Sequence, residues 1–129
     1  MKTNKFNLML ICICCFFLQN ALSQNTDNFI GIWQNDKKTI TIEIYKLENS
    51  YYGKLLKTTF KTNNRNQNED IIVQMKKDSE KVLYGGTYYN SNLNKSYEIK
   101  LRSIDYNTFY MKRFYRFLNK GYYWHRVVN

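Results

Sequence analysis

The feature that most constrains this chain is an alternation of apolar and polar residues with a period of two, which recurs along most of its length. Ile40, Ile42 and Ile44, for example, alternate with threonine and glutamate. Since successive side chains of a β-strand point to opposite faces, this pattern predicts strands with one apolar face and one face toward water. No segment after Gln24 sustains the period of an amphipathic helix. The alternation therefore predicts an all-β fold.

Turn-forming residues divide the alternating stretches into eight short strands. We expect these strands at residues 29–34, 39–45, 51–59, 71–75, 82–89, 97–102, 108–117 and 122–128. Consecutive strands with short links leave two sheet edges exposed unless the sheet closes on itself. We therefore predict an eight-stranded antiparallel up-and-down barrel. The interior of such a barrel is either filled by side chains or holds one small ligand, and the sequence leaves both possibilities open.

Irregular strand geometry is expected where glycines interrupt the pattern. The adjacent pair Gly85-Gly86 lies within the fifth predicted strand and favours a kink where the barrel wall bends. Gly53 in the third strand predicts a bulge or a close approach of the backbone. In the fourth strand, the alternation places Ile71, Val73 and Met75 on one face.

The N-terminal segment has the three parts of a secretion signal. A start with two lysines is followed by an apolar run from Leu8 to Leu18 and by the small-residue cleavage site Ala21-Leu22-Ser23. The eleven residues of the apolar run are too few to span a bilayer, which takes ~20. We therefore expect residues 1–23 to be a signal peptide and residues 24–129 to form one domain, in the periplasm or outside the cell.

No disulfide is expected to cross-link this domain. Cys12, Cys14 and Cys15 all fall inside the signal segment, so a structural disulfide and a thiolate metal site are excluded from the mature chain. A lipid anchor is the less favoured alternative to cleavage, because Ile11 and Ile13 are not the small residues that precede an acceptor cysteine. With a single histidine in the chain, a transition metal would find too few ligands. We expect neither a metal nor a cofactor.

Catalytic groups are equally scarce. General acid–base chemistry needs two groups held together in a desolvated cleft. Glu43 and Glu98 are each flanked by apolar residues that should face inward, so both carboxylates are expected to point outward. His125 lies between Trp124 and Arg126, which should also face inward, and it is therefore expected on the outside. The sequence thus predicts a protein that is not an enzyme.

Aromatic residues gather in the last third of the chain. Tyrosine combines apolar area with a hydroxyl group that can orient a ligand. The residues we single out as ligand-binding are Tyr84, Tyr88, Tyr97, Phe109, Arg113 and Trp124. The alternative is that aromatic side chains fill the barrel. In the seventh strand Phe109, Met111 and Tyr115 form one face, and Tyr110 and Phe114 form the other. A strand that is apolar on both faces abuts another element or belongs to an interface.

The formal net charge is +10, and the basic residues are spread along the chain rather than gathered in one run. Scattered charge is typical of a solvated surface, and binding to a polyanion is the alternative. Basic and aromatic residues interleaved on strands also suit single-stranded nucleic acid, but an exported protein rarely meets it. We therefore expect no nucleic-acid partner and favour an anionic envelope component, such as a glycan, lipopolysaccharide or phospholipid headgroups. The polar segment from Lys61 to Asp70 is expected to be a mobile loop at the barrel rim.

Gly31-Ile32-Trp33 in the first strand, together with Arg126 in the last, resembles the signature of the lipocalin-like (calycin) barrels. That resemblance implies that the tryptophan and the arginine pack together across the closed end of the barrel. A guanidinium over an indole face contributes ~0.5–2 kcal/mol and would tie the first strand to the last.

A longer pattern resembles the exported bacterial family known as domain of unknown function 2147. Its Gly-x-Trp start, its Tyr-Gly-Lys motif, its glycine-to-tyrosine hairpin and its Trp-x-Arg end can be followed here at Gly31, at Tyr52-Gly53-Lys54, from Gly86 to Tyr97 and at Trp124-His125-Arg126. In the hairpin Asn90, Ser91 and Asn94 stand where the family pattern has Asp, Pro and Gly, which keeps the turn propensity and removes a carboxylate. The structural signature comprises Gly31, Trp33, Gly53, Gly86, Tyr97, Trp124 and Arg126. The resemblance implies a lipocalin-like barrel and brings no established activity with it.

Together these features predict an exported, non-enzymatic protein that binds a small apolar or amphipathic ligand or docks on an envelope component. The alternative is a solid-core interaction module that binds a polyanion or a protein through its basic, aromatic surface. An enzyme is the remote third possibility, and it would require a catalytic pair that the alternation does not reveal.

Overall fold

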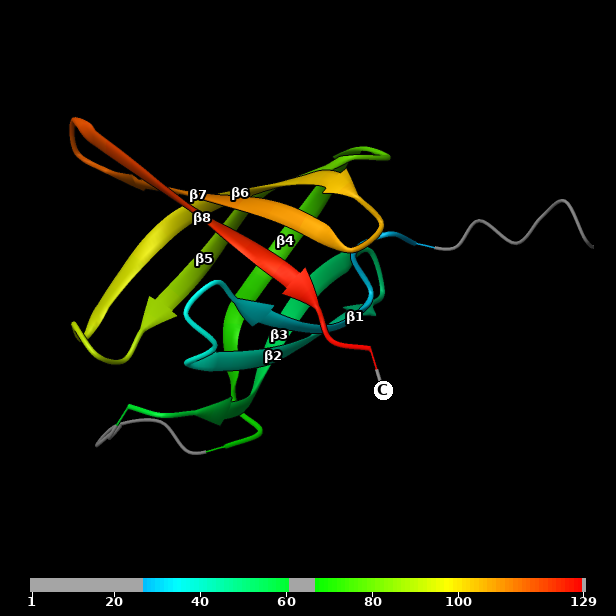
Figure 1. Cartoon of the computed structure of the whole chain (residues 1–129). Coiled ribbons are helices and arrows are strands. Elements are labelled where there is room, and N and C mark those ends of the chain that lie inside the picture. Colours follow the sequence, from blue (N-terminus) through cyan, green and yellow to red (C-terminus); the bar gives the residue numbers. More distant parts are fainter. Residues whose placement is uncertain (1–26, 61–66, 129) are drawn as a thin grey trace, which may run out of the picture.

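The computed structural model describes residues 27–60 and 67–128. Eight antiparallel strands form one closed barrel in which each strand pairs with the next and the last pairs with the first (Figure 1). The strands are β1 (Gly31–Asn35), β2 (Ile40–Leu47), β3 (Ser50–Thr58), β4 (Asp70–Ser79), β5 (Val82–Asn90), β6 (Lys95–Asp105), β7 (Thr108–Tyr115) and β8 (Leu118–Arg126). The predicted fold is confirmed. The expected signal peptide and residues 61–66 of the expected rim loop lie outside the described residues.

The predicted alternation builds the core. On β2, Ile42 and Ile44 are buried, whereas Glu43 between them is half-buried on the other face. On β6, Tyr97 and Ile99 are buried, and Glu98 is exposed. This alternation places one row of side chains inside the barrel and the other row in water. Within the described residues, no helix is long and apolar enough to cross a membrane.

The fourth strand departs from the prediction. Ile71 and Ile72 are both buried, Val73 is only half-buried, and the next buried residue is Met75. The expected common face of residues 71, 73 and 75 is therefore wrong. The cause is a bulge, because the pairing with β3 shifts along this stretch and Gln74 adopts a left-handed backbone with a φ of 58°. The extra residue reverses which side chains point inward.

The glycines of β5 do bend the strand as predicted. The register between β5 and β6 shifts between Leu83 and Gly86, and Gly85 has a φ of 74°. A Cβ added at Gly86 would lie 2.2 Å from Cγ of Met75 on the neighbouring strand. Gly53 of β3 serves a similar purpose, since the register shifts beside it and an added Cβ would lie 3.0 Å from side-chain atoms of Ile72.

The last hairpin is longer and tighter than expected. β7 ends at Tyr115 and β8 begins at Leu118, and these two residues pair directly. The turn is therefore Arg116-Phe117, and the predicted turn at residues 119–121 is wrong. Gly121 lies inside β8 because its missing side chain leaves room for the Tyr110 ring, whose hydroxyl oxygen would lie 1.6 Å from an added Cβ.

One end of the barrel is closed by the residues that lead into β1. Trp33 and Arg126 are register partners, and the Arg126 guanidinium lies 4.3 Å from the centre of the Trp33 ring. The same guanidinium donates hydrogen bonds to the main-chain carbonyls of Asn28, Ile30 and Tyr106. The packing implied by the lipocalin-like resemblance is thus present. Gly31 makes it possible, because an added Cβ would lie 2.4 Å from Nη1 of Arg126.

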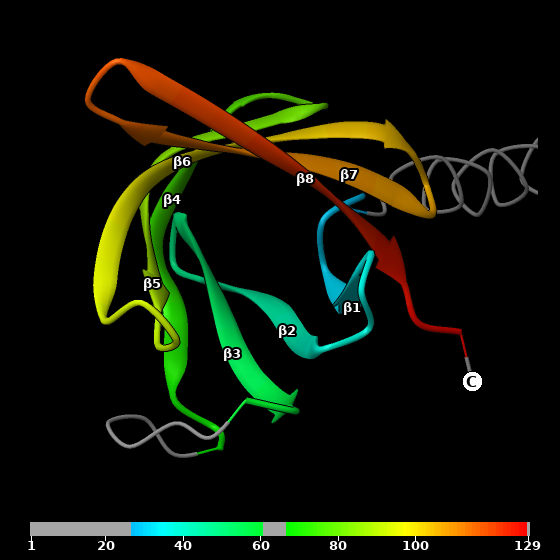
Figure 2. The same cartoon turned by 60° about the vertical axis from the view of Figure 1, so that its left-hand side comes forward.

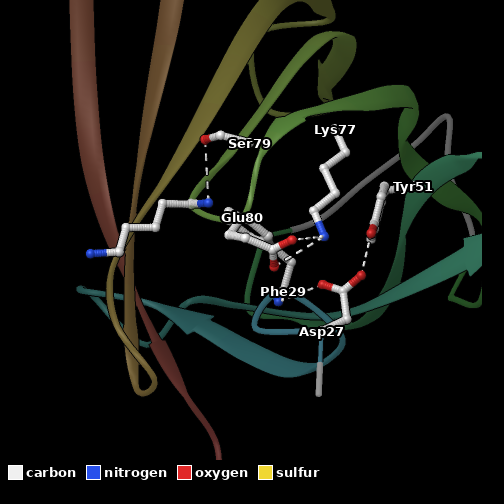
Figure 3. A network of polar contacts seen from close by, with 7 residues as sticks. Asp27, Phe29, Tyr51, Lys77, Ser79 and Glu80 are labelled. Carbon is white, nitrogen blue, oxygen red and sulfur yellow. Dashed lines mark hydrogen bonds and ion pairs between the residues drawn. The ribbon is translucent and has the colours of Figure 1, made fainter. Parts of the chain in front are cut away.

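A second set of polar contacts holds the closed end (Figure 3). The Asp27 carboxylate accepts hydrogen bonds from the main-chain N–H of Phe29 and from the hydroxyl group of Tyr51 on β3. Burial and this carboxylate raise the pKa of Tyr51. At the nearby β4–β5 turn, Lys77 forms an ion pair of 3.2 Å with Glu80. The Asp27 contacts fasten the entry segment to β3 beneath the barrel floor, and the ion pair braces the β4–β5 turn.

The ring closes over a short seam. β8 pairs with β1 at three positions, the last of which joins Asn35 to Trp124. Residues 118–123 of β8 therefore continue past the end of β1. In Figures 1 and 2 this part of the β7–β8 hairpin, drawn in orange and red, stands away from the other turns. The end of the barrel opposite the closed floor is consequently open at the seam.

Candidate functional site

A cavity of about 340 Å³ lies at this open end. Its walls come from the β1–β2 turn, the start of β2, the segment after β3, the β5–β6 hairpin and the inward faces of β7 and β8. The lining residues are Asn35, Asp36, Lys37, Thr39, Ile40, Phe60, Tyr88, Asn90, Asn92, Leu93, Met111, Arg113, Tyr122 and Trp124. The barrel interior is thus filled at one end and hollow at the other.

The floor of the cavity is aromatic. Trp124 and Met111 line it and are almost completely buried. Directly below, the Phe109 ring stacks on Trp124 at 6.0 Å between ring centres and meets the Trp33 ring edge-on at 4.6 Å. Rings packed in this way fix the depth of the cavity, because large core side chains in mutual contact leave no room for further penetration.

Arg113 is the central charge of the site. It follows Phe109 and Met111 on the inward face of β7, so its side chain enters the barrel. The guanidinium lies 4.4 Å from the ring centre of Tyr122 and 4.8 Å from that of Tyr97, and its Nη2 donates a hydrogen bond of 2.5 Å to the Tyr122 hydroxyl. Aromatic faces stabilise a cation but do not neutralise it.

Two buried donors of the site lack a hydrogen-bond acceptor among the described residues. These are Nε of Arg113 and Nε1 of Trp124, and both residues line the same cavity. Arg113 also forms no ion pair with a described carboxylate. Buried N–H groups are almost always satisfied, since an unsatisfied one costs ~1–3 kcal/mol. Both donors are therefore available to an acceptor on a ligand in this cavity.

Tyr88 contributes a neutral hydroxyl to the same wall. Burial raises the pKa of Tyr88 to about 12, although the nearby Arg113 charge acts in the opposite direction. The phenol consequently stays protonated at physiological pH and remains able to donate a hydrogen bond. The hairpin beyond it is shaped by Asn90, whose side-chain oxygen accepts from the main-chain N–H groups of Asn92 and Leu93.

The cavity rim is mixed in character. Lys37 is an exposed cation there, and Asp36 is the one carboxylate among the lining residues. Oδ1 of Asp36 lies 2.5 Å from Nε2 of His125, and both side chains are more than half exposed. A second recess, of about 250 Å³, shares Leu93 and Arg113 with the cavity. Its other walls are Tyr97, Tyr115, Leu118 and Lys120.

Residues 31–126 match the family described as "Uncharacterized protein conserved in bacteria (DUF2147)". The chain belongs to this family. The DUF2147 chain is also similar in structure to protein HP1028 from the human pathogen Helicobacter pylori, which is described as belonging to the lipocalin family. The two share 18% sequence identity and a TM-score of 0.68, over 81% of this chain and 86% of the other. This likeness shows a lipocalin-like fold. No curated protein matches the chain in sequence.

The structure brings together three of the six ligand-binding residues predicted for this DUF2147 protein. Tyr88, Arg113 and Trp124 line the cavity, and Tyr97 lines the adjoining recess. Phe109 is fully buried below the floor. Tyr84 does not join them, because the β5 bulge leaves it on the outer face with 45% of its surface exposed.

Tyr122 is the site residue that the sequence interpretation left unassigned. It lies two residues before Trp124 on β8 and therefore on the same face, so the alternation alone would have identified it. Tyr115 was expected on the same face of β7 as Phe109 and Met111, and it does occupy an alternate position on that face, but it is not buried. That residue lies past the end of β1 and is 41% exposed. The inward position before it is taken by Arg113.

The titratable side chains of the described residues are dispersed. No group of three or more histidine, cysteine, aspartate or glutamate side chains that could hold a metal ion is found among residues 27–60 and 67–128. The Asp36–His125 pair is solvent-exposed. What the site offers is a set of hydrogen-bond donors above an apolar floor.

Proposed function

We propose that this protein is an exported, non-enzymatic binding protein for a small amphipathic molecule with an acidic headgroup. The observation that carries the proposal is Arg113, a half-buried residue of the cavity wall whose Nε is buried without a described acceptor and which has no described carboxylate partner. A ligand carboxylate or phosphate would supply the missing acceptor, and such charge-assisted bonds are about twice as strong as neutral ones.

The neighbouring groups favour an anion over a cation. The Trp124 N–H can only donate, and Tyr88 keeps its hydroxyl proton to a pKa of about 12. The amide side chains of Asn35, Asn90 and Asn92 are neutral. Asp36 is the exception at the rim, and its carboxylate is engaged by His125. An acidic headgroup would thus meet donors on several sides.

The apolar part of the ligand would lie on the aromatic floor and against Leu93 and Met111. A volume of about 340 Å³ falls at the small end of the range typical of ligand sites, ~300–1,000 Å³. This size suits a medium-length acyl chain or one ring system rather than a complete diacyl lipid. The lipocalin-like fold supports the same reading, since barrels of this size can hold one small ligand.

Thermal unfolding with matched probes tests the proposal. A ligand that binds the folded state alone raises the melting temperature by mass action. Decanoate and 1-decanol have equal chains and differ in the headgroup, so we expect decanoate to raise the melting temperature and 1-decanol to raise it less. Absence of a shift with both probes would argue against an amphiphile site, and equal shifts would argue against an acidic headgroup.

Substitution of Arg113 separates the headgroup from the cavity. Arg113→Leu removes the inward charge, and we expect it to reduce decanoate affinity by roughly tenfold or more while leaving 1-decanol binding unchanged. Arg102→Leu is the matched control, because Arg102 lies on the exposed face of the neighbouring strand β6. If the two variants bind decanoate equally well, Arg113 is not the anion-binding group.

A further inference from the structure

The tip of the β7–β8 hairpin is apolar and uncovered. Phe117 is 100% exposed and Leu118 is 67% exposed, and Tyr115 beside them is 41% exposed. The tip projects past the end of β1 and stands away from the other turns at the same end of the barrel (Figures 1 and 2). Phe117 buries no apolar surface on folding, and Leu118 buries little. Core packing therefore does not explain why these residues are apolar.

Turn geometry does not explain them either. Arg116 adopts a left-handed backbone with a φ of 50°, a conformation that glycine and asparagine accept with least strain. Other turns of the chain place lysine, glutamate or asparagine in this conformation, since Lys38 and Glu48 have a φ of 55° and Asn94 a φ of 50°. The β7–β8 turn carries arginine followed by phenylalanine. Arg116 is therefore ordinary for this chain, and the left-handed position gives no reason for the exposed Phe117 beside it.

The surroundings of the tip are basic. The hairpin from residue 108 to residue 124 contains Lys112, Arg113, Arg116 and Lys120 and no acidic residue. Arg116 and Lys95 flank the Tyr115 ring at 5.6 Å and 5.3 Å from its centre, so their charges stay close to the tip. Long basic side chains can lie along an apolar surface and extend their charges to its edge. An apolar tip flanked by Arg116 and Lys95 matches an anionic bilayer surface, in which lipid phosphates lie directly above the acyl chains.

We propose that the β7–β8 tip docks on a lipid bilayer that carries anionic headgroups. Phe117 and Leu118 enter the boundary between headgroups and acyl chains, while Arg116 and Lys120 meet lipid phosphates. This docking is peripheral and reversible, because two apolar side chains and a few cations supply little more than a single anchor does.

A bilayer fits the tip better than a protein partner does. A stable protein interface needs ~800 Å² on each side, which is far more than a two-residue turn presents. A fluid interface accepts a narrow projecting tip without a complementary pocket. Docking also points the open end of the barrel toward the membrane, since Leu118 and Lys120 line the recess that adjoins the cavity. The proposal does not depend on the cavity being a ligand site.

Vesicle flotation with the full mature chain tests the docking. We expect binding to vesicles of phosphatidylglycerol and phosphatidylcholine, little binding to phosphatidylcholine alone, and loss of binding at high ionic strength. The double variant Phe117→Ser and Leu118→Ser should weaken binding to the anionic vesicles by roughly tenfold or more. The matched control is Ile104→Ser with Val128→Ser, which replaces two residues of 52% and 78% exposure away from the tip.

The results separate the alternatives. Equal binding to neutral and anionic vesicles, no binding to either, or unchanged binding by the tip variant would each overturn the proposal. Sedimentation velocity of the same proteins detects the competing case, in which the tip joins two copies of this chain. A dimer that the tip substitutions dissociate, without vesicle binding, would also overturn it. Arg113→Leu loses decanoate affinity without losing vesicle binding if both proposals hold, so failure of one is distinguishable from failure of the other.

Discussion

Trp33 makes the contacts on which the closed end depends. Its ring lies under the Arg126 guanidinium, its Nε1 donates to the Phe29 carbonyl at 2.8 Å, and its edge meets Phe109. We expect Trp33→Ala to lower the free energy of unfolding by ~3–5 kcal/mol, because a large buried aromatic leaves a cavity and an uncovered cation. Urea unfolding measures the change. Ile104→Ala, at a half-exposed site, should stay within ~0.5 kcal/mol of the wild type. Equal loss in both variants would contradict this role.

Tyr88 gives the fold a measurable dependence on high pH. Burial raises the pKa of this phenol from its ordinary 10.0 to about 12. The folded state holds the proton more tightly, so this contribution to stability is complete below pH ~10 and is lost as the pH rises through ~12. For a group this well buried, the loss amounts to at most ~3 kcal/mol.

Urea midpoints of the wild type and of Tyr88→Phe, measured from about pH 9 to about pH 12, test the assignment. The variant should lose less stability across this window. Some dependence will remain, because burial also raises the pKa values of Tyr45 and Tyr51. Two curves of equal slope would mean that the Tyr88 hydroxyl is not shielded from water.

At the scale of the strand, adjacent glycines in β5 are needed for different reasons. Gly86 lies against β4, and an added Cβ would lie 2.2 Å from Cγ of Met75 and 2.9 Å from the carbonyl oxygen of Val73. Gly85 has open space around its Cα but a φ of 74°. We expect Gly86→Ala to cost ~1–3 kcal/mol through overpacking. We expect Gly85→Ala to cost ~1–2 kcal/mol through backbone strain.

Asparagine distinguishes the two causes. Because asparagine tolerates the left-handed conformation, Gly85→Asn should be more stable than Gly85→Ala, whereas Gly86→Asn should be no better than Gly86→Ala. Thermal melts of the four variants decide the matter. A gain from asparagine at position 86 would show that the close approach to β4 is not the constraint there.

The strands show how far alternation carries a prediction. It identified β2 and β6 and their inward rows, because each has polar residues regularly between apolar ones. It failed in β4, where Ile71, Ile72 and Val73 are consecutive apolar residues and leave the parity undefined. The parity is set by the bulge at Gln74, which depends on how β4 fits between its neighbours. The same limit applies to the site residues. The bulge in β5 turns Tyr84 outward against the simple alternation, whereas Tyr122 follows the alternation with Trp124.

At the scale of the whole molecule, closure of the barrel was predictable and the cavity was not. Eight short strands with short links imply closure by counting alone. Whether the interior is hollow depends on where β1 ends relative to β8, and Asn35 pairs with Trp124 well before the hairpin tip is reached. Pairing between strands at opposite ends of the sequence leaves no local pattern. The sequence left open whether the barrel is hollow or filled, and the register between β1 and β8 decides it.

Export is a prediction about the whole chain that the barrel does not test. We expect protein recovered from an exporting host to begin at Gln24, with residues 1–23 removed. Intact-mass measurement of the secreted protein checks the cleavage site. Replacing Ala21 with tyrosine should slow processing, because the site requires a small residue at that position, and Thr26→Tyr beyond the site should not. Retention of the full-length chain by the unmodified protein would contradict the expectation.

The short seam between β1 and β8 is also the one place where neighbouring strands of the barrel are not connected directly by the chain. Every other neighbouring pair is joined by a connection in sequence, whereas this pair is held by three register positions and by Arg126. On the closed side β8 ends and β1 begins, and there the Val127 N–H donates to the Ile32 carbonyl. A short linker from Val128 to Asp27, with new termini between Arg116 and Phe117, would keep the entry segment and join these two strands covalently. Such a permuted chain would form the same barrel, with its termini at the open end instead of the closed end.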